Sequence, residues 1–222
     1  MKLCDLNPGP GIGASAWHVE IDGCGLLMDS GTHPKREGRD ALPLYDAVRE
    51  RPVDTIAITH CHHDHVGSLP VALRHFPRAH VMMSELSYFI VERVLHNSVN
   101  VMKHQAAELG ITGYPLFTHR EVDELAPIFQ GYRYNREIQW ATFDRTIAGK
   151  PSPTLEFFDA GHALGSAGIL VRGFAPYHGT PRHARLGADH PCRGLRHQGG
   201  ASLRRRPTVP GRTGRWHFCQ FF

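Results

Sequence analysis

The chain has 222 residues, with 41% hydrophobic residues, a formal net charge of +4 and 17 histidines, and its length suits one large domain or two small ones. No apolar run approaches the roughly 18 residues that a membrane span needs, and residues 1–9 contain no apolar leader, so we expect neither a membrane segment nor a secretory signal. The five cysteines show no Cys-x-x-Cys spacing, which disfavours a disulfide scaffold and indicates a reduced, cytoplasmic setting.

The positive charge is confined to the end of the chain. Residues 1–172 hold 20 acidic residues against 16 Lys and Arg, whereas residues 173–222 hold nine Arg, no Lys and a single acid, Asp189. The net charge therefore gives no evidence that the first part of the chain binds nucleic acid. We treat residues 1–172 as a folded domain and residues 173–222 as a tail of different composition.

The domain reads as strands interleaved with helices. After a glycine-rich loop, period-two alternation and short β-branched runs predict strands over residues 17–22, 26–28, 53–59, 79–83, 154–159 and 168–171. Apolar residues at helical spacing predict helices over residues 41–51, 66–76 and 84–97. A capping box, Thr118-His-Arg-Glu121, opens a further helix that is expected to carry Val122, Leu125 and Phe129. This order indicates a layered α/β protein with a mixed sheet.

The most informative stretch is Thr59-His-Cys-His-His-Asp-His65, which directly follows an apolar strand. Imidazole and carboxylate ligands suit zinc, and also manganese or iron. His60 and His62, two apart in an extended loop, can hold one ion, and the turn that follows can bring Asp64 and His65 to a second. Two neighbouring ions would supply an activated nucleophile at neutral pH. Cys61 and His63 are read as spacers.

The alternative is that these histidines are structural or form a weak surface chelator. The run is internal, is interrupted by an acid and lies at the carboxyl end of a strand, where open α/β sheets place their ligands. The pattern therefore favours a metal site.

His60-x-His62-x-Asp64-His65 resembles the HxHxDH signature of the metallo-β-lactamase superfamily. Three further segments resemble motifs of its β-CASP branch, which contains ribonuclease J, the archaeal cleavage factors and the pre-mRNA 3′-end endonuclease: Gly11–Ser15, Leu27–Pro34 and Asp159–Gly168. The resemblance covers roughly residues 3–172. It implies an αβ/βα metallo-β-lactamase sandwich, of which this chain holds the N-terminal part.

The resemblance also implies a role for each matching residue. His60, His62 and His162 would hold one zinc ion, and Asp64 and His65 would belong to a second. Asp64 would also steer the attacking water and act as general base. The family holds two zinc ions, but this chain is expected to hold one or fewer well, because two further family ligands are not found in residues 1–172.

Three residues near these ligands have more than one interpretation. Asp29 would orient a metal ligand, although a carboxylate that caps the Gly31 turn is an equally open reading. His33 would line the cleft or simply be exposed. Ser166 would donate to a phosphate or cap a turn.

The missing ligands are a bridging Asp at the end of a strand and a last histidine. No apolar strand ending in Asp follows Gly173, and Asp189 is a weak candidate. The tail is rich in Arg, Gly, Pro and His, which is typical of a GC-rich gene translated out of frame, so we favour a frameshift near residue 173. The rival reading is a disordered RNA-binding tail, in which Arg204–Arg206, Arg212 and Arg215 contact phosphates.

The function implied by the resemblance is zinc-dependent hydrolysis of a phosphodiester in RNA by a cytoplasmic nuclease. Two alternatives stay open. A thioester or lactone hydrolase similar to glyoxalase II shares the HxHxDH loop, and a truncated chain that lacks two ligands would catalyse nothing. Endonuclease or exonuclease preference, RNA sequence preference and oligomeric state cannot be read from the sequence.

Overall fold

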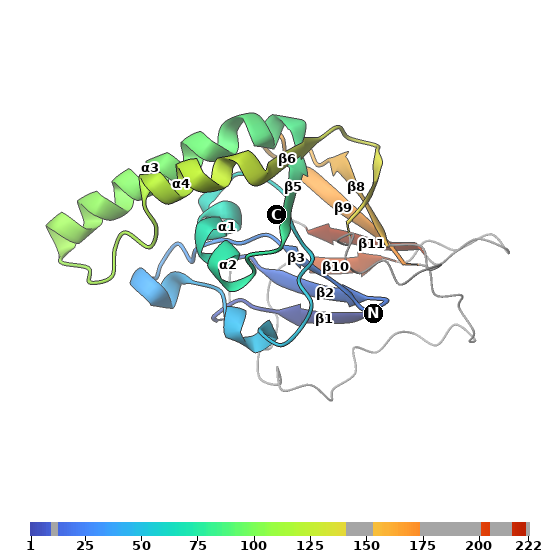
Figure 1. The fold of residues 1–222 in the computed structure, drawn as a ribbon, viewed down its shortest axis with the longest axis horizontal. Helices are drawn as coiled ribbons and strands as arrows, with labels where there is room; N and C mark the ends of the chain where they lie inside the picture. The colour runs from blue at the N-terminus through green and yellow to red at the C-terminus, as the bar shows by residue number, and fades with distance from the viewer. Residues whose placement is uncertain (10–12, 141–152, 174–200, 205–214, 221–222) are drawn as a thin grey trace, which may run out of the picture.

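The computed structural model describes residues 1–9, 13–140, 153–173, 201–204 and 215–220. Within these ranges the chain forms two β-sheets packed face to face, with helices on the outer face of the first sheet (Figure 1). This arrangement confirms the predicted fold class. Gly11 and Ile12 of the first motif and Asp189 of the tail lie outside the described residues.

The first sheet has six strands in sequence order, from β1 to β6. The strands β1, β2 and β3 are antiparallel, and β3 to β6 run parallel to one another. Their bounds are Lys2–Asp5 (β1), Trp17–Ile21 (β2), Cys24–Met28 (β3), Thr55–Ile58 (β4), His80–Ser84 (β5) and Phe129–Tyr132 (β6). The parallel half places the carboxyl ends of β3, β4 and β5 at one edge of the sheet, where the candidate site lies.

The second sheet is antiparallel, with the strand order β10-β11-β9-β8-β7. Its bounds are Glu137–Gln139 (β7), Thr154–Asp159 (β8), Ala167–Arg172 (β9), Ala201–Arg204 (β10) and Arg215–Gln220 (β11). Alternate residues of the two sheets face each other, because successive strand side chains point to opposite faces. The core between the sheets includes Trp17, Val19 and Ile21 of β2 and Ile169 and Val171 of β9.

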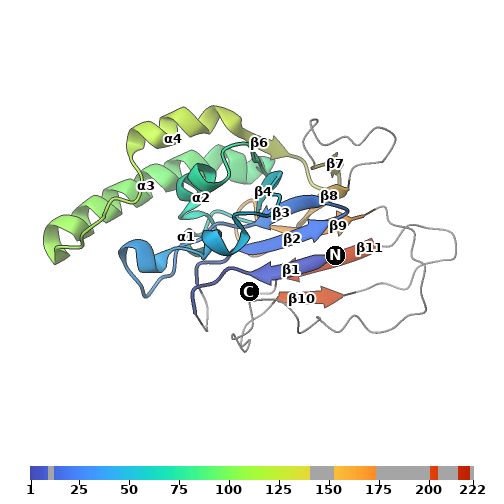
Figure 2. The ribbon, with the colours of Figure 1, turned by 60° about the horizontal axis from the view of Figure 1, so that its bottom comes forward.

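The helices cover the other face of the first sheet. They are α1 (His63–Val66), α2 (Leu69–His75), α3 (Glu85–Leu109) and α4 (His119–Leu125), with 3-10 turns at Gly38–Ala41, Tyr45–Val48 and Ala126–Ile128. The core beneath them includes Ile56 and Ile58 of β4 and Val91 and Leu95 of α3. Ala57 faces the second sheet, so β4 is buried on both faces, as its apolar sequence predicts. Figure 2 shows α3 and α4 side by side, with α3 extending beyond the sheets.

Several predicted helices differ from the structure, and proline explains the main differences. The predicted helix at 41–51 is wrong: Pro43 cannot donate a helical hydrogen bond, and two separate 3-10 turns flank it. The predicted helix at 66–76 is broken, because Pro70 lies at the start of α2 and cannot continue α1. Helix α4 ends before Pro127, so Phe129 opens β6 instead of lying on the helix. Helix α3 continues beyond residue 97 to a left-handed cap at Gly110.

Two strands of the tail, β10 and β11, are described, and they do not test whether the tail is out-of-frame sequence or an RNA-binding segment. Strand β11 pairs antiparallel with β9, with Trp216 opposite Val171, and β10 pairs with β11. The unpaired edge of a strand presents a row of backbone N–H and C=O groups that an extended segment can pair with whatever its composition. The other residues of the tail beyond residue 173 lie outside the described ranges. None of the helices in the described part of the chain combines the length and apolarity that crossing a bilayer requires.

Candidate metal centre

The site lies where the carboxyl end of β4 meets the loop between β8 and β9. Thr59, directly after β4, leads through His60 and His62 into α1, while His162 lies in the loop that joins the two strands of the second sheet. The backbone N–H of Ala167 donates to the carbonyl of Thr59 over 2.8 Å, which ties the two sheets together beside the site. Segments about 100 residues apart in the chain therefore meet at one point.

The side chains of His60, His62 and His162 converge. Each offers a ring nitrogen, and the three nitrogens lie within 4.8 Å of one another. The Nδ1 atom of His62 is 3.0 Å from Nε2 of His60 and 3.3 Å from Nε2 of His162. Nitrogen ligands held about 2.0–2.1 Å from a tetrahedral zinc ion lie roughly 3.4 Å apart. The residues present therefore fit one metal ion of this kind.

His60 is fully buried, whereas His62 and His162 are exposed at the mouth of the site. Burial, together with the neighbouring rings of His65, His62 and His162, lowers the pKa of His60 to about 3. The imidazole of His60 is therefore neutral at physiological pH and retains a lone pair, which metal binding requires.

A second pair of donors, Asp64 and His65, lies beside this triad. The Nε2 atom of His65 is 3.7 Å from Oδ2 of Asp64, and its ring centroid is 4.1 Å from that of His60. Burial alone would lower the pKa of His65, but the charge and hydrogen bond of Asp29, together with Asp64, raise it overall. The carboxylate of Asp64 is partly exposed.

The buried carboxylate of Asp29 contacts both the backbone before His60 and the ring of His65. Its Oδ1 accepts from the backbone N–H of Thr59 at 2.7 Å, and its Oδ2 lies 2.7 Å from Nδ1 of His65. The carboxylate thus contacts both the backbone of Thr59 and the ring of a candidate ligand, whereas the N–H of Gly31 donates to the carbonyl of Ser15, so a cap of the Gly31 turn by Asp29 is not what these contacts show. Its backbone has φ +61°, in the left-handed region that few residues other than glycine adopt and that often marks a functional site.

Sequence reasoning missed Thr59. Its hydroxyl donates to the Asp29 carboxylate at 2.9 Å and lies 3.1 Å from Nδ1 of His60, so it links the orienting acid to the triad. The sequence signal that could have pointed to Thr59 is its polar side chain at the end of an otherwise apolar strand.

The backbone of α1 is held by the Asp29–Thr32 loop and by Ser15. The N–H of Ser30 donates to the carbonyl of His65 at 2.8 Å, and the N–H of Ser15 donates to that of Asp64 at 2.8 Å. Gly31 packs directly against this turn, because a Cβ at that position would lie 1.6 Å from the Asp64 carbonyl oxygen. The glycine of the Asp-Ser-Gly motif is therefore required by a close backbone approach.

Ser166 fixes the loop that carries His162. Its buried hydroxyl accepts from the backbone N–H of His162 at 3.0 Å and from that of Ala163 at 3.1 Å. The loop is also anchored to α3, since the hydroxyls of Ser84 and Ser87 donate to the carbonyl of Gly165. Of the two readings of Ser166, the turn cap is the one that these contacts show.

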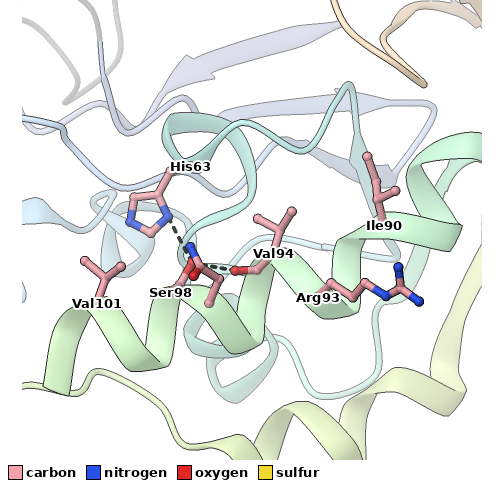
Figure 3. Close-up of a pocket in the computed structure, with 7 residues that line it drawn as sticks. His63, Ile90, Arg93, Val94, Ser98 and Val101 are labelled. Carbon is pink, nitrogen blue, oxygen red and sulfur yellow. Dashed lines mark hydrogen bonds between the residues drawn. The ribbon is translucent and has the colours of Figure 1, made fainter. Parts of the chain in front are cut away.

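Three neighbouring residues have hydrogen-bond partners outside the triad. Cys61 donates to the Ser87 carbonyl, and burial raises the pKa of its thiol to about 11. His63 turns toward α3, where its Nδ1 lies 3.1 Å from the Ser98 hydroxyl (Figure 3). It borders a cavity of about 420 Å³ formed mainly by α3. His33 is half-buried and accepts from the backbone N–H of Lys35 at its Nδ1.

The structure therefore brings His60, His62 and His162 together and places Asp64 and His65 beside them, with Asp29 behind. Their roles as ligands stay predictions. Within the described ranges, two groups of three donors are close enough to hold an ion, this triad and a separate group formed by Glu92, His96 and Asp123. Neither of these two groups supplies an aspartate that bridges the triad to a second metal position.

The sequence profile of the metallo-beta-lactamase superfamily matches residues 9–184. The chain belongs to this superfamily. That membership confirms the resemblance first read from the HxHxDH motif. Members of the family typically bind metal ions, in agreement with the cluster of histidines.

Curated relatives include RNA-processing endonucleases. The chain is 30% identical over 172 residues to endoribonuclease YSH1 of Gibberella zeae, covering 77% of this chain and 19% of that protein. It is 36% identical over 172 residues to cleavage and polyadenylation specificity factor 73 of Drosophila melanogaster, covering 77% and 23%. It is 27% identical over 169 residues to subunit 3-I of the Arabidopsis thaliana factor, covering 75% and 22%. The chain thus spans about a fifth of the length of these relatives.

Among solved structures, an archaeal metallo-beta-lactamase superfamily protein from Sulfolobus tokodaii matches with 18% identity and a TM-score of 0.47. The match covers 77% of this chain and 60% of that one.

Proposed function

We propose that this chain carries a metal-binding part of a zinc-dependent phosphodiesterase that acts on RNA. The observation that carries the proposal is the convergence of His60, His62 and His162 from two distant segments. The names of the relatives, endoribonucleases and cleavage factors, support RNA as the substrate. Because those proteins are about three to four times as long as this chain, their complete activity is not assigned to it.

The proposed roles follow from the contacts. His60, His62 and His162 hold one zinc ion, and Asp64 and His65 contribute to a second position. A divalent metal at this place supplies Lewis acidity toward a phosphate oxygen and a water molecule. Asp64, whose carboxylate is partly exposed, would accept the proton of the attacking water as general base. Asp29 keeps Nδ1 of His65 engaged, so that Nε2 faces the site.

The setting that we propose is intracellular and reducing. It is supported by Cys4, Cys24 and Cys61, which are buried thiols in the described part of the chain.

The test combines metal counting with an RNA cleavage assay on the full chain. We expect zinc to co-purify, and RNA hydrolysis to be abolished by a chelator and by His60→Ala/His62→Ala. A matched control is His104→Ala, which removes an exposed histidine on α3 that pairs with Glu108. RNA cleavage that survives the chelator would contradict the proposal, as would hydrolysis of a thioester in its place. A chain that binds zinc but cleaves no RNA would show that the missing ligands are essential and would overturn the activity while leaving the metal site intact.

A further inference from the structure

We infer that the cavity between His63 and α3 binds one nucleotide of a single-stranded RNA, beside the candidate metal centre. The inference rests on the proposed function, because it gives a place to the part of the substrate next to the scissile phosphate. The cavity measures about 420 Å³, within the range of roughly 300–1,000 Å³ of pockets that hold small organic ligands. Figure 3 shows His63 on one wall of the cavity and side chains of α3, among them Ile90 and Val94, on the other.

The cavity adjoins the histidine triad, because both loops that carry the triad are tied to α3. His63 directly follows His62, and its Nδ1 lies 3.1 Å from the hydroxyl of Ser98. The loop between β8 and β9, which carries the third histidine, is held at the first turn of the same helix, where the hydroxyl of Ser87 donates to the carbonyl of Gly165 at 2.9 Å. A substrate held at the triad can therefore extend along α3 into the cavity.

The floor of the cavity is apolar and is formed by one row of α3 residues. Ile90, Val94, Ser98 and Val101 lie at intervals of four, four and three residues, which places them on the same side of the helix. Val101 is 46% exposed, so part of this apolar floor is open to solvent. Proteins that bind unstacked bases hold the flat face of the base against aromatic and apolar side chains, and burial of such a surface is favourable.

A second row of α3 residues carries groups that suit the rest of a nucleotide. Phe89, Arg93 and Asn97 follow one another at intervals of four residues, so they also share one side of the helix. Arg93 and Asn97 line the cavity, and Phe89, one turn earlier, is 64% exposed. A guanidinium group binds a phosphate, an amide group pairs with the edge of a base, and an exposed aromatic ring stacks on a neighbouring base.

The charge of the cavity favours an anionic ligand over an apolar protein segment. Within the described ranges no carboxylate pairs with the guanidinium group of Arg93, whereas Arg74 and Arg120 each pair with a glutamate. An apolar floor with one unpaired cation is complementary to a ligand that has a flat uncharged part and one negative charge. A nucleotide within an RNA strand has this composition, while an apolar segment would leave Arg93 without an anion.

The experiment measures the fluorescence anisotropy of a labelled ten-nucleotide oligouridine as the full chain is added, in the presence of EDTA so that binding is separated from cleavage. Arg93→Gln should weaken RNA binding about tenfold, and Phe89→Ala should do so by a similar factor. Both side chains are exposed, so their replacement leaves the core intact. Val101→Trp should also weaken binding, because the larger ring would fill part of the cavity.

Two control variants match these changes on the same helix. Lys103→Gln removes a positive charge from an exposed residue that does not line the cavity, and Leu109→Ala removes an apolar side chain that is as exposed as that of Phe89. Both should bind RNA like the unaltered chain. NMR gives the location: uridine 5′-monophosphate should shift the methyl resonances of Ile90, Val94 and Val101, and inorganic phosphate alone should not.

The inference is overturned if Arg93→Gln and Lys103→Gln bind RNA equally well. It is also overturned if Val101→Trp leaves RNA affinity unchanged but alters the oligomeric state in sedimentation, because the cavity would then belong to an interface between copies of the chain. A chain that cleaves no RNA but loses RNA affinity on Arg93→Gln would support the cavity and contradict the proposed activity. A chain that cleaves RNA with the same KM before and after Arg93→Gln would do the reverse.

Discussion

Asp29 Oδ2 lies 2.7 Å from Nδ1 of His65, and the two side chains are 0% and 8% exposed. A carboxylate engaged at Nδ1 fixes the tautomer and the rotation of the ring, so that Nε2 is presented toward Asp64. The same carboxylate binds the backbone of Thr59, one residue before His60. A single buried acid therefore sets the position of donors at both proposed metal positions.

Asp29→Asn should weaken metal binding by about 10–100-fold, because the amide supplies a weaker and differently arranged partner for His65. The pKa of His65 should also fall, since burial continues to lower it while the charge of Asp29 no longer raises it. Competition with a zinc chelator measures the affinity, and NMR titration measures the pKa.

Asp54→Asn is the matched control for this substitution. Asp54 is also a buried acid that accepts a backbone N–H, from Gly25 at 2.8 Å, but it takes no part in the site. The Asp54→Asn substitution should lower the free energy of unfolding and leave zinc affinity unchanged. Equal losses of zinc affinity in the two variants would mean that Asp29 acts only through folding.

Gly31→Ala should destabilise the fold by about 1–3 kcal/mol or more and reduce metal binding, because the new Cβ would collide with the backbone of Asp64. The obstacle is a main-chain carbonyl 1.6 Å away, which cannot move without displacing α1. Gly168→Ala is the comparison, since a Cβ there meets nothing within 4 Å. Urea denaturation of both variants measures the effect, and a Gly31→Ala protein as stable as Gly168→Ala would show that the close approach is not real.

The stability of the metal-free protein should depend on pH through His60. Its folded pKa is about 3, below the ordinary 6.5, so below pH ~6.5 the unfolded chain binds a proton that the folded chain does not. The free energy of unfolding should therefore fall as the pH drops from 7 toward 5, by up to about 1.4 kcal/mol per pH unit for this residue. The contribution of His65 to the free energy of unfolding depends on pH in the opposite direction, because its pKa is raised in the folded state. This stabilisation is fully present below the pKa of the unfolded chain and is lost as the pH rises through the folded pKa.

Urea titrations of the metal-free chain at a series of pH values test this. In the His60→Gln variant, the free energy of unfolding should fall less steeply between pH 7 and pH 5. His104→Gln, which changes an exposed histidine, should keep the slope of the unaltered chain. An unchanged slope in His60→Gln would show that His60 is not buried in its neutral form.

The close arrangement of the candidate donors in this loop could be predicted in large part because the relevant information is local. His60, His62, Asp64 and His65 lie within six positions after one apolar strand, and the carboxyl edge of the sheet is a known place for ligands. Nothing local connects His162 to them, and only the family resemblance suggested it. Its position depends on the packing of two sheets.

Other features depend on tertiary contacts that no sequence pattern displays. Thr59 reads as the last β-branched residue of a strand, and its hydrogen bond to Asp29 exists only once β3 and β4 are paired. Strand β6, with the sequence Phe-Gln-Gly-Tyr, has weak strand propensity and forms because β5 offers an edge. The group of Glu92, His96 and Asp123 went unseen because its members lie on two helices whose packing the sequence did not reveal.

Ser166→Ala should lower zinc affinity more than it lowers stability. Removal of the hydroxyl leaves the N–H groups of His162 and Ala163 without their acceptor, so the loop should relax and His162 should leave the triad more often. The loss of stability should resemble that of a helix N-cap, about 1 kcal/mol, while zinc should be held about tenfold more weakly. Ser98→Ala is the control, because Ser98 is a buried serine that contacts His63 and the α3 backbone but no proposed ligand. If Ser98→Ala weakens zinc binding as much as Ser166→Ala does, the serine beside His162 has no special part in positioning it.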